Sequence, residues 1–225
     1  KESSIAASGT ILHMLNHSMF KLVLFLVAGV IVQNLHALDL NEIRGFGRKK
    51  PYLMLCYLFG ALGIGGVPGW SGYISKTLLH EGIVEGIHHM HASHTAELGL
   101  KCAEIVFLIS GGITCAYMIK LFIAVFVEKN TTNEAKMRES DKNYLSLPGK
   151  IAIGVPAVLL FVFGMFPHLF YDRFAALASG FMNAEPMAHE VKYMSLANLK
   201  GAAISIAVGV VVYFFIVRTW MMKKE

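Results

Sequence analysis

The chain has 225 residues, of which 55% are hydrophobic and only 16% are charged, and its formal net charge is +5. Charged residues make up about a quarter of an ordinary soluble domain, so this chain has too few of them to solvate the surface of a globule of its size. The composition therefore excludes an ordinary soluble domain. In so apolar a chain, the excess of Lys and Arg indicates loops that flank membrane spans rather than nucleic-acid binding.

The cysteines and glycines predict no cofactor. Cys56, Cys102 and Cys115 lie in or beside apolar segments without paired spacing, so neither a disulfide framework nor a zinc or iron–sulfur site is expected. No glycine-rich phosphate loop follows a strand pattern. The chain begins with Lys1 rather than Met, and we expect it to be a piece of a longer protein.

Five stretches are apolar enough to cross a membrane, which takes about 20 residues in a helix. In chain order they cover residues 5–35, 51 to beyond 76, 100–127, 151–170 and 201–217. We therefore predict an all-α fold, a polytopic membrane helix bundle. Residues 128–150 are typical of a polar linker, and residues 151–225 of two C-terminal spans with an interfacial segment between them.

The first span carries three ionisable residues, His13, His17 and Lys21, spaced four apart. Each step of four turns a helix by about 400° and advances it by about 6 Å, so the side chains form one stripe. An ionisable group inside a bilayer costs at least about 2.5 kcal/mol, which makes it a candidate functional site. Imidazoles linked by single waters can pass protons, so the stripe predicts a proton relay. The alternative is a set of packed polar residues that hold helices together.

The second span is interrupted near its middle. The interruption contains Gly65, Gly66, Pro68 and Gly69. Proline removes a helical hydrogen bond and glycine weakens the helix, and such a break at membrane depth is tolerated where it is buried in protein or lines a water-filled cavity. Lys76 follows the break and His80 lies one turn further. We predict one discontinuous transmembrane helix with Lys76 as an ion-transport residue. The alternative is a kinked packing helix whose Lys76 snorkels to the interface, and this alternative is favoured by the short second half-helix that we expect after the break.

Two later features are candidates of a weaker kind. Lys120 lies in the third span, eight residues before the polar linker at Glu128, so it is either a further relay residue or a snorkelling base. Four histidines gather before that span: His88, His89, His91 and His94. Such a tract could bind metal, but we expect a wet loop on the outer side.

Basic residues are divided unequally between alternate connectors. If all five spans cross, one set of connectors and the C-terminal end carry 12 Lys and Arg, and the opposite set carries 5. Because cytoplasmic loops hold the excess of Lys and Arg, we predict that the connectors at 44–50 and 128–150 are cytoplasmic. We expect an integral protein of a bacterial or archaeal plasma membrane.

The motif His13-Met-Leu-Asn-His17-Ser-Met-Phe-Lys21, followed by Leu24-Phe25-Leu26 and Gly29, resembles the antiporter-like membrane subunits of respiratory complex I. That family includes subunits of Mrp-type sodium/proton antiporters and of membrane-bound hydrogenases. Ile43-Arg44-Gly45-Phe46, Gly66-Val67-Pro68, Gly72-Tyr73 and Ser75-Lys76 are similar to the next segments of those proteins. The match is specific from about residue 12 to residue 76 and moderate to about residue 126.

The resemblance implies inverted helix repeats, each with one discontinuous helix, and residues 1–127 would be part of the second repeat. It matches His13, His17 and Lys21 to the family's connecting relay. It matches Lys76 to the broken-helix residue, which is Lys in some members and Glu in others, and Lys120 to a basic residue of the next helix. Trp70-Ser71, just before Gly72, departs from the residues that the family usually has there, so the resemblance does not imply the local shape of the break.

The function implied is that of a proton- or cation-translocating subunit of a redox-driven complex, such as NADH:quinone oxidoreductase or a membrane-bound hydrogenase. Such a subunit holds no redox cofactor, and its partners are other membrane subunits, the lipid bilayer and protons or Na⁺, not nucleic acid. One alternative is a subunit of a stand-alone Mrp-type Na⁺/H⁺ antiporter. A remote alternative is a haem-binding membrane anchor, which would need His168 to face His13 or His17 as a second axial ligand.

Overall fold

A computed structural model describes residues 2–89, 94–129, 143–180 and 191–221. The elements in chain order are α1 (Glu2–Leu35), α2 (Leu40–Ile43), α3 (Pro51–Gly65), α4 (Ser71–His89), α5 (His94–Phe122), the π-helical turns η1 (Ile123–Val127), α7 (Leu147–Met165), α8 (Pro167–Ser179), α9 (Leu196–Val212) and the π-helical η2 (Tyr213–Met221). Within these ranges every regular element is helical, which confirms the predicted all-α fold.

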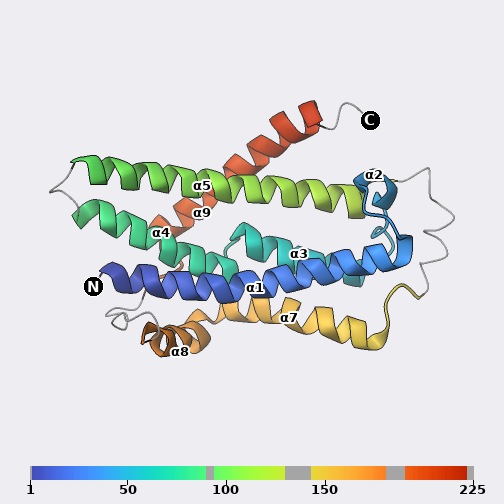
Figure 1. Ribbon diagram of the computed structural model, residues 1–225, viewed down its shortest axis with the longest axis horizontal. Coiled ribbons are helices and arrows are strands. Elements are labelled where there is room, and N and C mark those ends of the chain that lie inside the picture. The colour runs from blue at the N-terminus through green and yellow to red at the C-terminus, as the bar shows by residue number, and fades with distance from the viewer. Residues whose placement is uncertain (1, 90–93, 130–142, 181–190, 222–225) are drawn as a thin grey trace.

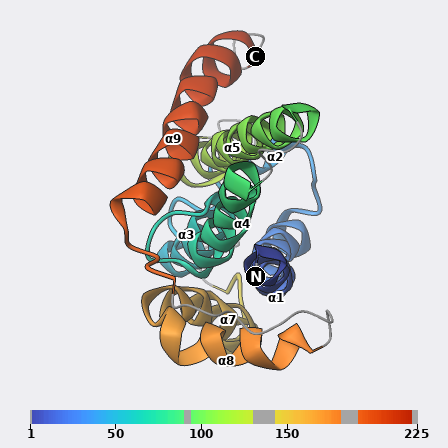
Figure 2. The ribbon, with the colours of Figure 1, turned by 90° about the vertical axis from the view of Figure 1, so that its left-hand side faces the viewer.

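The long helices form an elongated bundle (Figure 1). α4 packs along α1, and α9 packs along α5. α7 lies against both α1 and α3. Seen from the end of the bundle, α9 flanks α5 on one side, while α7 and α8 cover the opposite side (Figure 2). The two C-terminal spans therefore pack against different parts of the preceding helices.

Four helical stretches in the described ranges are long and apolar enough to cross a membrane. They are Ser4–Leu35, His94–Val127, Leu147–Met165 and Leu196–Trp220. The bundle leaves large apolar side chains such as Phe25, Val106 and Phe215 well exposed, as lipid-facing side chains are. The remaining predicted span is divided, because Pro51–Gly65 is a shorter apolar helix and α4 continues beyond the break.

The predicted discontinuity lies between α3 and α4. Gly66 has the left-handed φ of 74° that ends a helix, and its N–H bonds to the carbonyl of Gly63 at 3.0 Å. Pro68 and Gly69, the latter at φ 93°, complete the turn before α4 begins at Ser71. The expectation of a short second half-helix was wrong, since α4 has 19 residues.

α8 follows α7 almost at once and runs across the bundle, so that it is seen nearly end-on in Figure 1. Its Tyr171 and Ala175 are buried against the interior, whereas Leu169 and Leu177 are 56% and 80% exposed. α8 thus has one buried and one exposed face, and its place at a membrane interface stays a prediction. Residues 181–190 of the predicted interfacial segment lie outside the described ranges.

The connector at 44–50 packs against η1, which continues α5. The N–H groups of Gly45 and Gly47 bond to the carbonyls of Ala124 and Val125, and Arg44 forms an ion pair with Glu128 at 3.1 Å. Lys50, expected to be a loop charge, is fully buried. Its Nζ donates to the Phe46 carbonyl at 3.0 Å and lies 4.1 Å from the centre of the Phe46 ring, which replaces the solvent that a loop lysine would have.

Candidate functional site

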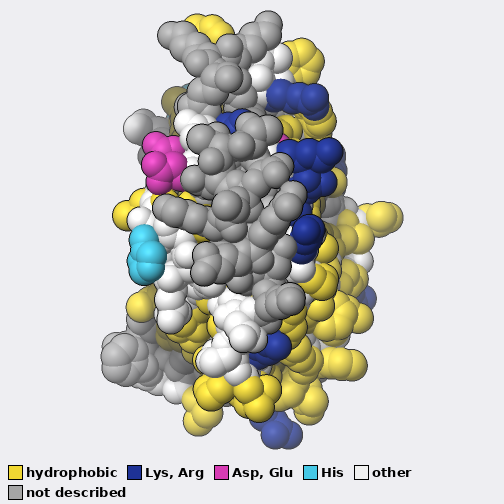
Figure 3. Space-filling view, turned by 90° about the vertical axis from the view of Figure 1, so that its right-hand side faces the viewer, with side chains coloured by type: hydrophobic (Ala, Val, Ile, Leu, Met, Phe, Trp, Pro, Cys, Tyr) yellow, Lys and Arg dark blue, Asp and Glu magenta, His cyan; other side chains and the backbone are white. Residues whose placement is uncertain are grey.

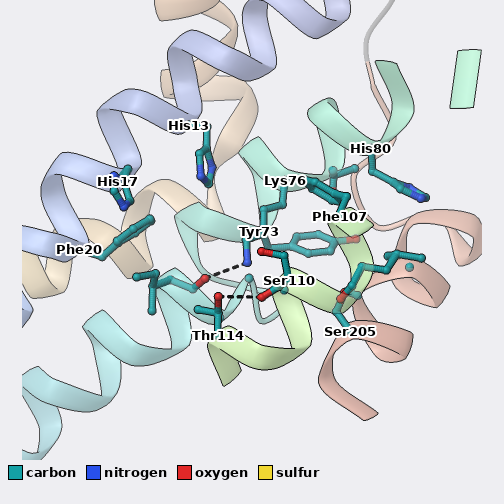
Figure 4. A pocket seen from close by; sticks show the side chains of 18 of the residues that line it. His13, His17, Phe20, Tyr73, Lys76, His80, Phe107, Ser110, Thr114 and Ser205 are labelled. Carbon is teal, nitrogen blue, oxygen red and sulfur yellow. Dashed lines mark hydrogen bonds between the residues drawn. The ribbon is translucent and has the colours of Figure 1, made fainter. Parts of the chain in front are cut away.

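A cavity of about 240 Å³ opens between α1, α4, α5 and α9 (Figure 4). Its lining includes five His and Lys side chains: His13, His17 and Lys21 from α1, and Lys76 and His80 from α4. Hydroxyls of Ser110 and Thr114 from α5 and of Ser205 from α9 also line it. Because a water molecule in the liquid takes about 30 Å³ and needs polar partners, this cavity can hold several waters.

The break positions Lys76. The Lys76 Nζ donates a hydrogen bond of 2.9 Å to the carbonyl oxygen of Ile64, in the last turn of α3. The last carbonyls of a helix have no partner within the helix and carry partial negative charge, so the broken end of α3 is a suitable seat for an ammonium group. Gly66 leaves room for the lysine stem, because a Cβ at Gly66 would lie 2.7 Å from the Lys76 Cδ.

The predicted stripe begins beside Lys76 and runs along α1. His13 Nδ1 lies 3.1 Å from the Oγ of Ser75, the residue before Lys76. The His13 and His17 rings are roughly parallel, with centroids 6.0 Å apart. Lys21 is half-buried, and its Nζ lies 6.0 Å from the centre of the Phe25 ring. Figure 4 shows His13 pointing into the same cavity as Lys76. The structure therefore brings four of the five predicted relay residues to one cavity, together with Gly65 and Gly66 of the break.

Two other sequence candidates lie elsewhere. Lys120 is in the last turn of α5 and is not among the described residues that line the cavity. His168, the second ligand that a haem anchor would need, lies on α8 with its Nδ1 3.0 Å from Asp172. It does not reach the cavity that holds His13 and His17.

The four clustered histidines are only partly described. α4 extends through His88 and His89, α5 begins at His94, and residues 90–93 lie outside the described ranges. The helices thus continue into the segment where a longer wet loop was expected. Among the described residues, no group of three or more His, Cys, Asp or Glu is placed to hold a metal ion.

Asn16 is a site residue that sequence reasoning treated only as part of a motif. It is fully buried, its Nδ2 donates to the Ser71 carbonyl at 2.9 Å, and its Oδ1 accepts from the Tyr171 hydroxyl at 2.5 Å. The Asn16 amide therefore links α1 and α8 by hydrogen bonds to the first residue of α4, where the helix begins again after the break. The available signal was a buried amide in an apolar span, which needs partners from neighbouring helices.

His80 and Glu104 were also passed over as a pair. The His80 Nε2 lies 3.0 Å from the Glu104 Oε1, across the α4–α5 contact. On the sequence, the only signal was the spacing of four between Lys76 and His80, which puts both on one face of a helix. Nothing in the sequence pairs His80 with a carboxylate 24 residues away.

Comparison with known proteins identifies the same family as the motifs. Residues 2–97 match the family model described as NADH:quinone oxidoreductase/Mrp antiporter, transmembrane. Over 162 residues the chain is 27% identical to Na(+)/H(+) antiporter subunit A1 of Staphylococcus haemolyticus, covering 72% of this chain and 20% of that protein. Over 178 residues it is 23% identical to hydrogenase-4 component B of Escherichia coli, covering 79% and 26%.

A third relative comes from a quinone reductase. The chain is 30% identical over 160 residues to NADH-quinone oxidoreductase subunit M of Rickettsia felis, covering 71% of this chain and 29% of that subunit. The chain thus spans between a fifth and a third of the length of these curated relatives. The matches and the broken-helix bundle agree with the resemblance seen in the motifs, and the chain belongs to the NADH:quinone oxidoreductase/Mrp antiporter transmembrane family.

Proposed function

We propose that this chain is part of a membrane subunit that translocates protons, or another cation, through a buried relay. The relay consists of Lys76, His13, His17 and Lys21. Lys76 is the group that changes charge, and the α1 stripe conducts protons to and from it. Lys120 is proposed as a further relay residue only on the family resemblance, since it lies away from the cavity.

One observation carries this proposal. The Lys76 amine sits at the broken end of α3, and its cavity also contains the α1 stripe. A lysine that only snorkelled would direct its amine to the lipid–water interface, away from the bundle interior. Instead its Nζ bonds to the Ile64 carbonyl, in the middle of the divided span.

The chemistry follows from the side chains. A neutral Lys76 can take a proton from cavity water, and the resulting ammonium is stabilised by the carbonyls at the end of α3. A neutral imidazole accepts a proton on one nitrogen and releases one from the other, so His13 and His17 can pass protons in either direction. Steps of about 6 Å along α1 are short enough for single waters to bridge.

The host of the subunit is proposed to be a redox-driven complex with other membrane subunits as partners. Two relatives support this, being named as a hydrogenase component and a quinone oxidoreductase subunit. The alternative, a stand-alone antiporter, is favoured by the relative named as a Na(+)/H(+) antiporter subunit. Membrane vesicles distinguish the two, since the antiporter moves protons on a Na⁺ gradient without an electron donor.

The relay is tested by Lys21→Met in the complete protein in its native membrane. Met keeps most of the lysine stem but cannot carry a proton, so proton transport per subunit should fall at least about tenfold, a conservative figure beside the roughly 100-fold or more that one positioned proton-transferring group contributes. Lys101→Met is the matched control, because Lys101 is an exposed lysine of α5 paired with Glu97. Transport is followed with a pH-sensitive dye and the amount of subunit by immunoblot. Normal transport by Lys21→Met would return the stripe to a packing role.

The orientation is proposed from the basic connectors. Lys and Arg side chains gather at the end of the molecule that carries the 44–50 connector (Figure 3). This end is assigned to the cytoplasm, and the protein to a bacterial or archaeal plasma membrane.

Cysteine labelling tests the orientation. We expect an impermeant thiol reagent added outside intact cells to miss Arg48→Cys and Lys129→Cys, both exposed positions, and to label Thr95→Cys at the other end of α5. The background carries Cys102→Ser, because Cys102 is exposed. Labelling of positions 48 and 129 from outside would show that the orientation is the opposite of the one proposed.

A further inference from the structure

Beyond Lys76, α4 carries a second ionisable group into the bundle. The side chain of His80 is 18% exposed and that of Glu104, on α5, is 29% exposed, and the two are in hydrogen-bonding contact, with 3.0 Å between Nε2 and Oε1. Ionisable side chains within a membrane span cost free energy, so a pair of them at a helix contact is a candidate functional site. The relay proposed above does not use this pair.

The His80 ring is held in a fixed orientation. The Phe107 ring lies roughly parallel to it, at 19° with centroids 6.1 Å apart. On its α9 side, a Cβ on Gly201 would lie 3.5 Å from the His80 Nδ1, so the absence of a side chain there leaves this nitrogen accessible. His80 and Gly201 both line the cavity. One ring nitrogen is therefore bonded to Glu104, while the other faces a wall of the cavity that contains Lys76.

Lys76 and His80 are connected by polar space. They lie four residues apart on α4, about 6 Å along the helix axis, but their side chains diverge, so the connection between them is a chain of waters along the cavity wall. Ser205 of α9 lines the same cavity, and its Oγ donates to the Leu108 carbonyl at 3.1 Å. This Oγ lies near the Lys76 amine, because a Cβ at Gly111 would be 3.1 Å from the Ser205 Oγ and 3.9 Å from the Lys76 Nζ. Figure 4 shows the His80 ring pointing away from Lys76, so that the two groups extend the polar lining in opposite directions.

Several other charged groups of the neighbouring helices have partners of their own. On α4, Glu81 accepts a hydrogen bond of 2.6 Å from Asn198 of α9. On α5, Lys101 is paired with Glu97, one turn before Glu104. From α1, His13 is the ionisable group at the Lys76 side of the cavity. Glu104 is thus the carboxylate bonded to His80, and it lies toward the end where α5 begins, opposite the 44–50 connector.

We propose that His80 and Glu104 form an exchange leg, meaning a proton path between Lys76 and the face of the bundle opposite the basic connectors. This inference rests on the proposed function of Lys76. The Lys76 ammonium gives a proton through water to Nδ1 of the neutral His80 ring and becomes a neutral amine. The Nε2 proton of the imidazolium passes to the Glu104 carboxylate, which releases it to water at the exposed side. The ring regains its starting tautomer by exchanging protons with water.

The test uses amide variants in the complete protein in its native membrane. Gln at position 80 or 104 can still hydrogen-bond across the α4–α5 contact but cannot transfer a proton at neutral pH. We expect His80→Gln and Glu104→Gln each to lower proton transport about tenfold, and the double variant to be no worse than either, because both groups serve one step. Transport is normalised to the amount of subunit and compared with Lys76→Ala in the same membranes.

His168→Gln is the matched control. It removes the histidine of a second His–carboxylate pair, His168 with Asp172, which is more exposed and lies on α8 outside the cavity. Its transport should stay near wild type. If Lys76→Ala stops transport while both Gln variants remain near wild type, the exchange leg is refuted and the function of Lys76 stands. If Lys76→Ala transports normally, the proposed function fails and this inference fails with it.

If the Gln variants no longer accumulate in the membrane, the exchanged variant His80→Glu/Glu104→His tests the proposal instead. It keeps an imidazole and a carboxylate in contact, so we expect both abundance and transport to return. Abundance that returns without transport would mean that the pair only braces α4 against α5, which would overturn the proposal.

Discussion

Lys76→Arg is expected to stop proton transport almost as completely as Lys76→Ala. Guanidinium keeps the positive charge but does not deprotonate in proteins, so Arg fixes the site in its charged state. Ala removes the charge altogether. If the site works by changing its charge at the break, both variants lose the same step, and each should fall by roughly 100-fold, in the range for a lost acid–base group.

Lys76→Glu is the informative third variant. The resemblance places Glu at the matching position in some family members, and a carboxyl group can also gain and lose a proton. We expect Glu to recover part of the transport that Ala loses. Its carboxylate faces the Ile64 carbonyl instead of donating to it, so full recovery is not expected.

The three variants are compared with wild type in membranes of equal subunit content, with proton uptake measured against electron transfer or against a Na⁺ gradient. Lys101→Arg is the control for the size of the guanidinium group on a spanning helix, at an exposed position. Arg near wild type together with an impaired Ala variant would mean that a fixed positive charge suffices. Lys76 would then be an electrostatic anchor, not a proton site.

The local features of this site could be predicted from the sequence because they depend on residues close together in the chain. The stripe of His13, His17 and Lys21 follows from helical spacing alone. The break follows from the conformational limits of Gly66 and Pro68, and the structure has the turn at that point. Such features need no knowledge of which helices are neighbours.

Contacts between distant segments could not be predicted in this way. The Asn16–Tyr171 bond joins residues 155 apart and the His80–Glu104 pair joins residues 24 apart, so both depend on how the helices pack. The length of α4 was misjudged for the same reason. Two of its charged residues have partners on other helices, since Lys76 bonds to Ile64 of α3 and Glu81 bonds to Asn198 of α9. Their partners come from other helices, which a single-helix pattern does not reveal.

Gly72→Ala is expected to destabilise the protein strongly and to impair proton transport. Gly72 lies in the first turn of α4, where that turn passes the last turn of α3. A Cβ at position 72 would overlap the carbonyl oxygen of Gly63 and lie 2.8 Å from its carbonyl carbon. Both contacts are with backbone, so no side chain can rotate away, and the two half-helices must separate.

Separation of the half-helices would act on Lys76 as well as on stability. The Lys76 Nζ depends on the Ile64 carbonyl, one residue after Gly63, so a shift of α3 away from α4 lengthens that bond. Overpacking of a core costs about 1–3 kcal/mol and more where the backbone is rigid. We therefore expect a melting temperature lower by about 5 °C or more, scaled from such a loss in a chain of this size, together with little transport by the subunit that remains.

Gly29→Ala is the matched control, because no described atom lies within 4 Å of a Cβ at that position of α1. Ala is favoured over Gly inside a helix by about 1 kcal/mol, so this variant should be as stable as wild type or more stable. Thermal unfolding of the purified protein and transport per subunit are measured for both. A Gly72→Ala protein with wild-type melting temperature and transport would show that α3 and α4 need not approach this closely. In that case the carbonyl end of α3 would not be what holds Lys76, since the break could open without loss of function.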